Sequence, residues 1–416
     1  MGVCNSMHRR WRLLFLLSVT GAGLSLADDG ATPARETVEL RAREGLPNFF
    51  RKTRGTNLIR VAYFGGSITA ADGWRPQSLA WLRARYPAAQ FAEVNAAIGG
   101  TGSDLGVFRL QRDVLVHRPD LVFVEFAVND GGAPPAQIHR CMEGIVRQVW
   151  KADPATDVCF VYTLHEGMTN DLAAGRLPRS AGAMEQVADH YGIPSIHLAL
   201  EAARRVRVGE WVFTAPTPEA PADPAKGLPA RPAFAPDGCH PFAETGHRLY
   251  TEAITRSFEK MENPGRPAPH ALGQPFTPDN HENAKMIALD RRFLAGNWEK
   301  LEPADSSLAR GFANRLPALW QADRAGASLR FSFRGRWAVR LRPARSGRRR
   351  TRSDRRWARA HQGAALRCVL HVPPPGHARA LLGHQLRRPQ RDRQADEHIV
   401  RQGGHPAPQR QHDGQA

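Results

Sequence analysis

The chain has 416 residues, of which 42% are hydrophobic and 24% charged, so it can bury at least one full core, and a fibrous or wholly disordered protein is excluded. Its net charge of +18 suggests a nucleic-acid or membrane partner only if the charge is spread along the chain. Residues 334–416 hold 20 Arg, no Lys and 5 acidic residues, which leaves 38 basic against 35 acidic residues in the rest. The main body is nearly neutral, and we expect no nucleic-acid partner.

Residues 1–27 have the features of a signal peptide. Arginines at positions 9, 10 and 12 precede an apolar run that begins at Leu13, and small residues suited to cleavage stand just before Asp28. The run is shorter than the ~20 apolar residues that a membrane span needs, which disfavours an uncleaved anchor. We therefore expect a secreted or periplasmic protein without stable membrane insertion after cleavage.

Residues 57–262 are predicted to form one α/β domain, because apolar runs alternate with segments of helical period. Proline- and alanine-rich residues 215–236 are predicted to be a long loop rather than a sixth strand. The expected fold is a flavodoxin-like three-layer α/β/α sandwich with a parallel sheet. Its predicted strands are residues 59–64, 91–96, 121–126, 158–163 and 194–198, and its predicted helices are residues 74–85, 104–117, 136–151, 180–191 and 244–259.

Residues 263–333 are predicted to be a linker and the start of a small β module. Residues 283–297 have a helical pattern, and residues 328–333 alternate like a strand. Residues 334–416 form a basic low-complexity tail without apolar periodicity. We expect this tail to be disordered or translated from a shifted reading frame. A genuine basic arm that binds nucleic acid is the alternative.

A serine follows the first predicted strand in VAYFGGSIT, residues 61–69. Ser67 would therefore lie at the carboxyl end of a parallel strand, where α/β sheets place their ligands. Gly65 and Gly66 permit a sharp turn and leave room for a substrate. Taken alone, this sequence is also typical of an ordinary helix cap.

A histidine and an aspartate stand together in DGCHP, residues 237–241, before the last predicted helix. A serine hydroxyl needs a base that accepts a proton near neutral pH, and imidazole does so. His240 fits that role, and Asp237 could orient its ring. A helix N-cap aspartate followed by an exposed histidine is the alternative.

Two further segments offer donors to a negatively charged oxygen. The sequence NAAIGGTGS, residues 95–103, follows the second predicted strand, and VEFAVND, residues 124–130, ends the third. Backbone N–H groups of the first and the Asn129 amide of the second could stabilise an oxyanion. A glycine-rich turn and an Asx turn are the alternatives.

Together these four segments resemble the SGNH (GDSL-like) hydrolase family, with its GDS-like serine, a glycine after the second strand, a GxND-like asparagine and a late DxxH. The resemblance covers residues 59–260 and implies a nucleophile at Ser67, triad partners at Asp237 and His240, and oxyanion donors at Ser67, Gly100 and Asn129. The family's aspartate before the serine is replaced here by Gly66. His165, shortly after the fourth strand, is a further candidate to face the substrate.

The resemblance implies hydrolysis of acyl esters. We expect acetyl groups on a polysaccharide as the substrate, with lipid or aryl esters also open. An O-acetyltransferase with the same triad and a non-catalytic carbohydrate-binding protein are the alternatives. We predict no metal and no cofactor, since cysteines 141, 159, 239 and 368 form no CxxC pair or zinc-like spacing. The sequence leaves the oligomeric state open.

Overall fold

The structure is a computed structural model that describes residues 36–262, 265–322, 326–334, 337–339, 357–359 and 365–371. The chain divides into two compact units, Met1–Lys285 and Met286–Ala416. The expected signal peptide lies outside the described residues. Among the residues described, no helix combines the length and the apolar character needed to cross a membrane.

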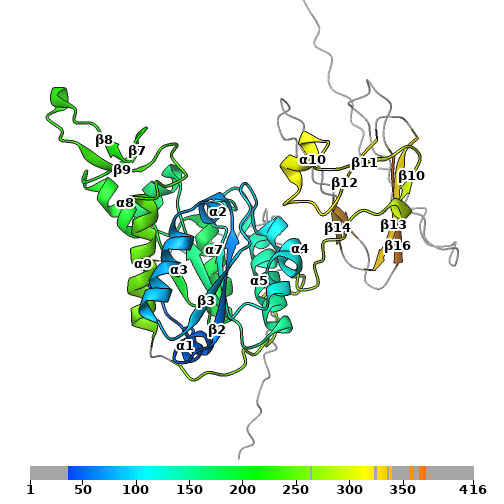
Figure 1. Ribbon diagram of the computed structural model, residues 1–416, viewed down its shortest axis with the longest axis horizontal. Coiled ribbons are helices and arrows are strands. Elements are labelled where there is room, and N and C mark those ends of the chain that lie inside the picture. Colours follow the sequence, from blue (N-terminus) through cyan, green and yellow to red (C-terminus); the bar gives the residue numbers. More distant parts are fainter. Residues whose placement is uncertain are drawn as a thin grey trace, which may run out of the picture. The chain divides into compact units, whose positions relative to one another are not determined.

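The first unit is built on a six-stranded sheet in the order β1-β6-β5-β4-β2-β3 (Figure 1). All neighbouring pairs are parallel except β1 with β6, which is antiparallel. Because the chain passes from β2 to β3 on one side and then to β4 on the other, the strand order reverses beside β2. The strands are β1 Leu40–Arg41, β2 Leu58–Gly65, β3 Gln90–Asn95, β4 Leu121–Glu125, β5 Asp157–Tyr162 and β6 Ser195–His197.

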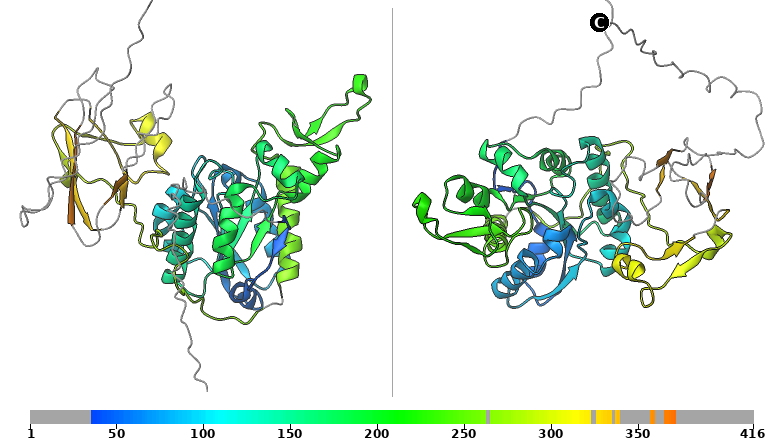
Figure 2. Two further views of the ribbon diagram at one scale, coloured as in Figure 1. Left: turned by 180° about the vertical axis from the view of Figure 1, so that it is seen from behind. Right: turned by 90° about the horizontal axis from the view of Figure 1, so that it is seen from above.

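Helices cover both faces of this sheet (Figures 1 and 2). One face packs against α1, α3, α8 and α9, and the other against α4, α5 and α7. The predicted flavodoxin-like three-layer sandwich is thus confirmed. The helices of this unit are α1 Pro47–Thr53, α2 Ser67–Ala70, α3 Trp74–Arg85, α4 Ser103–Asp113, α5 Pro135–Ala152, α6 Thr169–Ala173, α7 Arg179–His190, α8 Leu200–Arg207 and α9 Gly246–Met261, with 3-10 turns η1 Leu115–His117, η2 Glu166–Met168 and η3 Pro224–Lys226.

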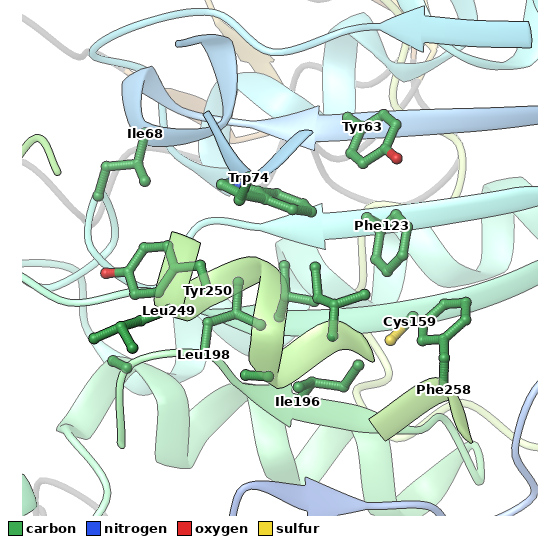
Figure 3. Packing of buried hydrophobic residues seen from close by; sticks show 14 of the residues in the cluster. Tyr63, Ile68, Trp74, Phe123, Cys159, Ile196, Leu198, Leu249, Tyr250 and Phe258 are labelled. Carbon is green, nitrogen blue, oxygen red and sulfur yellow. The ribbon is translucent and has the colours of Figure 1, made fainter. Parts of the chain in front are cut away.

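Alternate side chains of β2 enter two separate hydrophobic cores. Tyr63 faces the α3 and α9 side, whereas Phe64 faces the α4 and α5 side. On the first side the Tyr63 and Phe123 rings stack with their centroids 5.2 Å apart, and Trp74 meets Phe123 edge-on at 5.7 Å (Figure 3). This packing fixes the carboxyl end of β2 between two buried layers.

The first unit contains short elements that sequence patterns did not predict. Edge strand β1 and helix α1 precede residue 57, and residues 215–236 are not all loop. Within them β9 pairs with β7 and β8, and the hairpin between β8 and β9 extends away from the central sheet (Figure 1). The prolines around β9 mask its strand pattern in the sequence. In the structure the buried Phe234 of β9 packs on Tyr250 of α9. The strands are β7 Val212–Thr214, β8 Glu219–Ala220 and β9 Arg231–Ala235.

Residues 265–285, which we call the C-terminal strap, lie in the stretch predicted to be a linker but pack against the first unit. The His270 ring contacts the Asp157 carboxylate at 2.7 Å. The Glu143 carboxylate accepts the N–H groups of Phe276 and Thr277 at 2.6 and 2.7 Å. Asp157 and Glu143 are fully buried, so the strap supplies hydrogen bonds that water cannot reach.

The second unit consists of short β-sheets, and the predicted strand at residues 328–333 is confirmed as β13. The predicted helical pattern at residues 283–297 is wrong, because this segment holds the 3-10 turn η4 and strand β10. Strands pair as β10-β13-β16, β11-β12 and β14-β15. The elements are η4 Arg291–Phe293, β10 Leu294–Ala295, β11 Glu299–Leu301, α10 Ser307–Phe312, β12 Leu319–Gln321, β13 Ser328–Arg334, β14 Trp337–Val339, β15 Trp357–Arg359 and β16 Ala365–His371.

Three of these strands, β14, β15 and β16, lie in the tail that we expected to have no folded element. Strand β16 pairs antiparallel with β13 from Ser328↔His371 to Arg334↔Ala365. These short strands form through pairing with β13 or with each other, which the composition of the tail does not indicate. Disorder of the tail as a whole stays a prediction. Most of the tail lies outside the described residues, and its origin in a shifted reading frame stays a prediction that the gene's nucleotide sequence would test.

Removal of the strap should destabilise the first unit. A chain that ends at residue 262 loses the three hydrogen bonds that the strap makes to the Asp157 and Glu143 carboxylates, and a hydrogen bond to a charged group is worth ~1.5–3 kcal/mol. Since ~1 kcal/mol moves the Tm of a domain of this size by about 2–4 °C, we expect a Tm at least ~5 °C below that of a chain ending at residue 285. Differential scanning calorimetry of the two chains measures this, and equal Tm values would contradict it.

Candidate active site

The two glycines before Ser67 are required by the close approach of neighbouring segments. A Cβ atom at Gly65 would lie 2.7 Å from the Glu125 carbonyl oxygen and 2.8 Å from Thr69 Oγ1, and one at Gly66 would overlap Asn129 Oδ1. Ser67 begins α2 and is half-buried. It lies just beyond the carboxyl end of β2, where the strand order reverses and α/β sheets bind their ligands.

Ser67, His240 and Asp237 form a continuous chain of hydrogen bonds. Ser67 Oγ lies 2.8 Å from His240 Nε2, and His240 Nδ1 lies 2.6 Å from Asp237 Oδ2. Hydrogen bonds from the His240 backbone and ring hold the pKa of Asp237 at about 2, so its carboxylate is ionised near neutral pH. An ionised acceptor places the ring proton on Nδ1, which leaves Nε2 to accept the serine proton.

The segment that carries His240 is held in place by its own turn and by a neighbouring loop. Asp237 Oδ1 accepts the N–H groups of Cys239 at 3.0 Å and His240 at 2.8 Å. Gly238 has a φ of +73°, a conformation that suits glycine, and its carbonyl accepts the Glu166 N–H at 2.8 Å. The turn therefore presents His240 to Ser67, although 173 residues separate them in sequence.

Asn129 and the glycine loop of residues 99–102 approach the serine turn. The Asn129 side chain is exposed and packs against Gly66, the residue before the serine. A Cβ at Gly99 would lie 3.5 Å from Ser67 Cβ, whereas one at Gly100, which has a φ of +72°, would meet nothing within 4 Å. The glycine loop thus passes next to Ser67, with Gly100 at an open position.

His165 lies at the start of η2 and caps it, since its Nδ1 accepts the Gly167 N–H at 3.1 Å. Its neighbour Glu166 is the residue that contacts Gly238. His165 is therefore close in sequence to a residue that supports the His240 turn. That its side chain faces a substrate stays a prediction.

Asp130 is a buried residue of the site that sequence reasoning missed. Its Oδ1 accepts the Ser103 N–H at 3.0 Å, which caps α4 where the glycine loop ends. A Cβ on Gly102 would overlap this oxygen. Burial raises the pKa of Asp130 to about 7, only partly offset by hydrogen bonds from Ser103. Its position directly after the candidate Asn129 is the sequence feature that could have indicated Asp130.

Arg109 of α4 is a second buried group that sequence patterns did not indicate. Its guanidinium donates to the Ala96 carbonyl at 2.5 Å and to the Gly65 carbonyl at 3.3 Å, and it lies over the Phe64 ring. Desolvation lowers its pKa to about 10, so it remains a cation near neutral pH. Arg109 joins the carboxyl ends of β2 and β3, which precede the serine and the glycine loop.

A cavity of about 160 Å³ lies elsewhere in the first unit, between the strap and the domain. Its lining includes Glu44, Trp150, Tyr191 and His270. His270 contacts Asp157, the first residue of β5, so this cavity is near the amino end of that strand. Ser67 follows the carboxyl end of β2, which runs parallel to β4 and β5. The cavity and the serine site therefore lie at opposite ends of the parallel strands.

A serine, a histidine and an aspartate in hydrogen-bond contact at the carboxyl end of a parallel sheet have the arrangement that serine hydrolases use. Residues 63–249 match the family model of the GDSL-like lipase/acylhydrolase family. This part of the chain belongs to that family, which confirms the resemblance found in the sequence. The protein is accordingly a carboxylic ester hydrolase.

Two similar solved structures are of a two-domain esterase (CEX) active on acetylated mannans. One is 22% identical, covers 72% of this chain and 75% of that chain, and has a TM-score of 0.54. The other, co-crystallised with mannopentaose, is 23% identical with the same coverage and a TM-score of 0.53. At these identities the likeness establishes the fold. A catalytic mutant of Axe2, an acetylxylan esterase from Geobacillus stearothermophilus, is 16% identical over 48% of this chain and 93% of that chain, with a TM-score of 0.36. No curated protein sequence matches significantly.

The raised pKa of Asp130 predicts a specific dependence of stability on pH. Its folded pKa of about 7 exceeds the usual value of 3.8, so between these pH values the folded chain binds more protons than the unfolded chain. The free energy of unfolding therefore loses a contribution as pH rises from about 4 to about 7. Asp130→Asn removes this loss.

We expect the stability of Asp130→Asn relative to the parent to increase steadily from pH 5 to pH 8 in urea unfolding. Asp153→Asn, at an exposed position of the same unit, is the control whose difference from the parent should stay constant. A constant difference for Asp130→Asn would contradict the raised pKa.

Proposed function

We propose that this protein cleaves acyl esters with Ser67 as nucleophile, His240 as general base and Asp237 as the group that orients His240. The observation that carries the proposal is the continuous hydrogen-bonded chain from Ser67 Oγ through the imidazole to the Asp237 carboxylate. The Ser67–His240 contact is within the distance that a proton transfer needs, and the His240–Asp237 contact can orient the imidazole ring.

In the proposed reaction, Ser67 Oγ attacks the ester carbonyl carbon while His240 Nε2 takes the hydroxyl proton. The tetrahedral intermediate collapses, His240 returns the proton to the leaving alcohol, and the acyl group stays on Ser67. Water, deprotonated by His240, then attacks the acyl carbon, and the acid leaves as Ser67 recovers its proton. Asp237 stabilises the imidazolium that forms in each half of the cycle.

The proposed oxyanion donors are the backbone N–H groups of Ser67 and Gly100 and the side-chain amide of Asn129. Ser67 is the first residue of α2, and the N–H groups of a helix's first turn have no partner within the helix. Asn129 contacts the adjacent Gly66, so its amide can approach the same oxygen. Such donors act on the charge that develops in the transition state.

We propose that the substrate is an acetylated polysaccharide and that the protein acts outside the cytoplasm. The support is the likeness over 72% of the chain, at a TM-score of 0.54, to an esterase described as active on acetylated mannans, together with the signal-like residues 1–27. In this proposal residues 57–262 are the hydrolase domain, and the second unit is a separate β module.

Ser67→Ala should abolish ester cleavage and leave Tm nearly unchanged, because it removes the nucleophilic oxygen from a half-buried turn. Release of p-nitrophenol from p-nitrophenyl esters, and of acetate from acetylated glycans, measures the activity of the purified mature chain.

His240→Ala should be almost as inactive, since the three residues act as a unit. A larger loss for His165→Ala than for His240→Ala would transfer the base role to His165. Acetate found on an added sugar instead of in solution would identify a transferase.

Asn129→Ala should lower kcat by roughly 10²-fold with little change in KM, as expected for a donor that acts in the transition state. Asn129→Asp is the informative partner variant, because it keeps the shape of the side chain but cannot donate when ionised. Steady-state kinetics should find it as slow as Asn129→Ala. Normal kcat in Asn129→Asp, or a change confined to KM, would assign Asn129 to packing or substrate binding.

A further inference from the structure

A buried carboxylate lies directly behind the Ser67 turn. Glu125 is the last residue of β4, pairs in register with Gly65, and is 1% exposed. Where the related family has an aspartate next to its serine, this chain has Gly66. The environment of Glu125 indicates how the turn is held without that aspartate.

Donors from the serine turn and from the end of β5 converge on the Glu125 carboxylate. Thr163, just after β5, donates its hydroxyl to Oε1 at 2.7 Å, and Thr69 of α2 donates to Oε2 at 2.9 Å. The backbone N–H of Gly66 is near enough to this carboxylate to lower its pKa. Two of these residues, Gly66 and Thr69, flank Ser67 in sequence.

No side chain at position 66 could make these contacts, because a Cβ there would overlap the Asn129 amide. Space for Asn129 next to Ser67 and an aspartate at position 66 are therefore incompatible in this backbone. The neighbouring strand supplies the carboxylate from the opposite side of the turn. Glu125 ends β4, and Asn129 follows shortly after it in the chain. The end of this one strand can therefore position the serine and also place an amide beside it.

Burial raises the pKa of Glu125, and the Thr163 and Thr69 hydroxyls and the Gly66 N–H act in the opposite direction. A buried ionisable group costs folding free energy unless it is well hydrogen-bonded. All three partners can donate, and the Gly66 N–H can only donate, so an acceptor at this place is required to satisfy that N–H. The folding free energy that burial of Glu125 costs is therefore spent at the turn that carries Ser67.

We propose that Glu125 is a positioning residue that fixes the Gly66–Ser67 backbone, so that Ser67 Oγ stays within reach of His240 and the Ser67 N–H faces the oxyanion. This inference rests on the proposed function of Ser67. Glu125 is enclosed below the turn and acts through Gly66 and Thr69 rather than on the substrate.

The test compares Glu125→Ala, Glu125→Gln and Glu125→Asp with a matched control at Glu143. Glu143 is likewise fully buried and accepts two backbone N–H groups and the Tyr191 hydroxyl, but its partners are in the strap and α7 region. Its replacement by Ala should lower Tm without lowering kcat at temperatures where the protein is folded. Steady-state kinetics on p-nitrophenyl acetate and Tm are measured for every variant.

Glu125→Ala should lower kcat by about 10²-fold with KM within about threefold, because a small displacement of a reacting group has effects of this size. Glu125→Gln should recover kcat to within about tenfold of the parent, since its amide oxygen can face Gly66 while a threonine hydroxyl turns to accept. If Glu125→Ala does not fold, Glu125→Asp decides, because it keeps the charge but cannot span all three donors and should lose at least about tenfold in kcat. Parent-like kcat in the folded Ala or Asp variant overturns the proposal, as does an equal loss of kcat in Glu143→Ala.

A second readout separates this proposal from the proposed function. A fluorophosphonate reacts with an activated serine without any ester turnover, and mass spectrometry locates the adduct. If the parent cleaves no ester, the proposed function fails. The Glu125 proposal then requires that Ser67 be labelled in the parent and at least about tenfold more slowly in Glu125→Ala. Equal labelling rates, or none in the parent, would overturn it.

Discussion

Close contact between the ends of β2 and β4 is the constraint on which the serine site depends. Gly65 and Gly66 have no side chains, so the Glu125 carbonyl and the Asn129 amide can approach the backbone just before Ser67. The strand order reverses at this place, which opens the carboxyl edge of the sheet to a substrate. Any larger residue at either position would push the two strand ends apart and separate Ser67 from Asn129.

Buried polar groups hold the loops around this contact. Glu125 takes the donors of the serine turn, Asp130 caps α4 at the end of the glycine loop, and Arg109 joins the ends of β2 and β3. Desolvation raises the pKa of Glu125 and of Asp130 and lowers the pKa of Arg109, so in each case it favours the neutral form of the group. Groups of this kind are expensive to bury, and here many of their hydrogen bonds end on backbone or hydroxyl groups of the segments around the serine turn, while Arg109 also pairs with Asp113. The exposed pair Asp237 and His240 contrasts with them, with side chains about half accessible to solvent.

The same use of buried carboxylates recurs at the other edge of the sheet. Glu143 and Asp157 bind the C-terminal strap through hydrogen bonds, so residues that read as a Pro/Gly-rich linker become part of the first unit. In the second unit, β13 finds a partner in β16, more than thirty residues later. Both cases depend on partners distant in sequence, which composition and local periodicity do not reveal.

The layered α/β fold could be predicted from the sequence alone, because five apolar runs alternate with segments of helical period. The sequence also identified Ser67, Asp237, His240 and Asn129 as candidates, since each stands at a predicted strand end or tight turn. The 2.8 Å approach of Ser67 Oγ to His240 Nε2 could be seen only in the folded chain, because 173 residues separate the two and no local pattern encodes their contact. The tertiary structure alone revealed Glu125, Asp130 and Arg109, since a buried charge is recognisable only by the distant groups that surround it. The strap, β9 and β16 were likewise decided by contacts that outweigh proline-rich or arginine-rich composition.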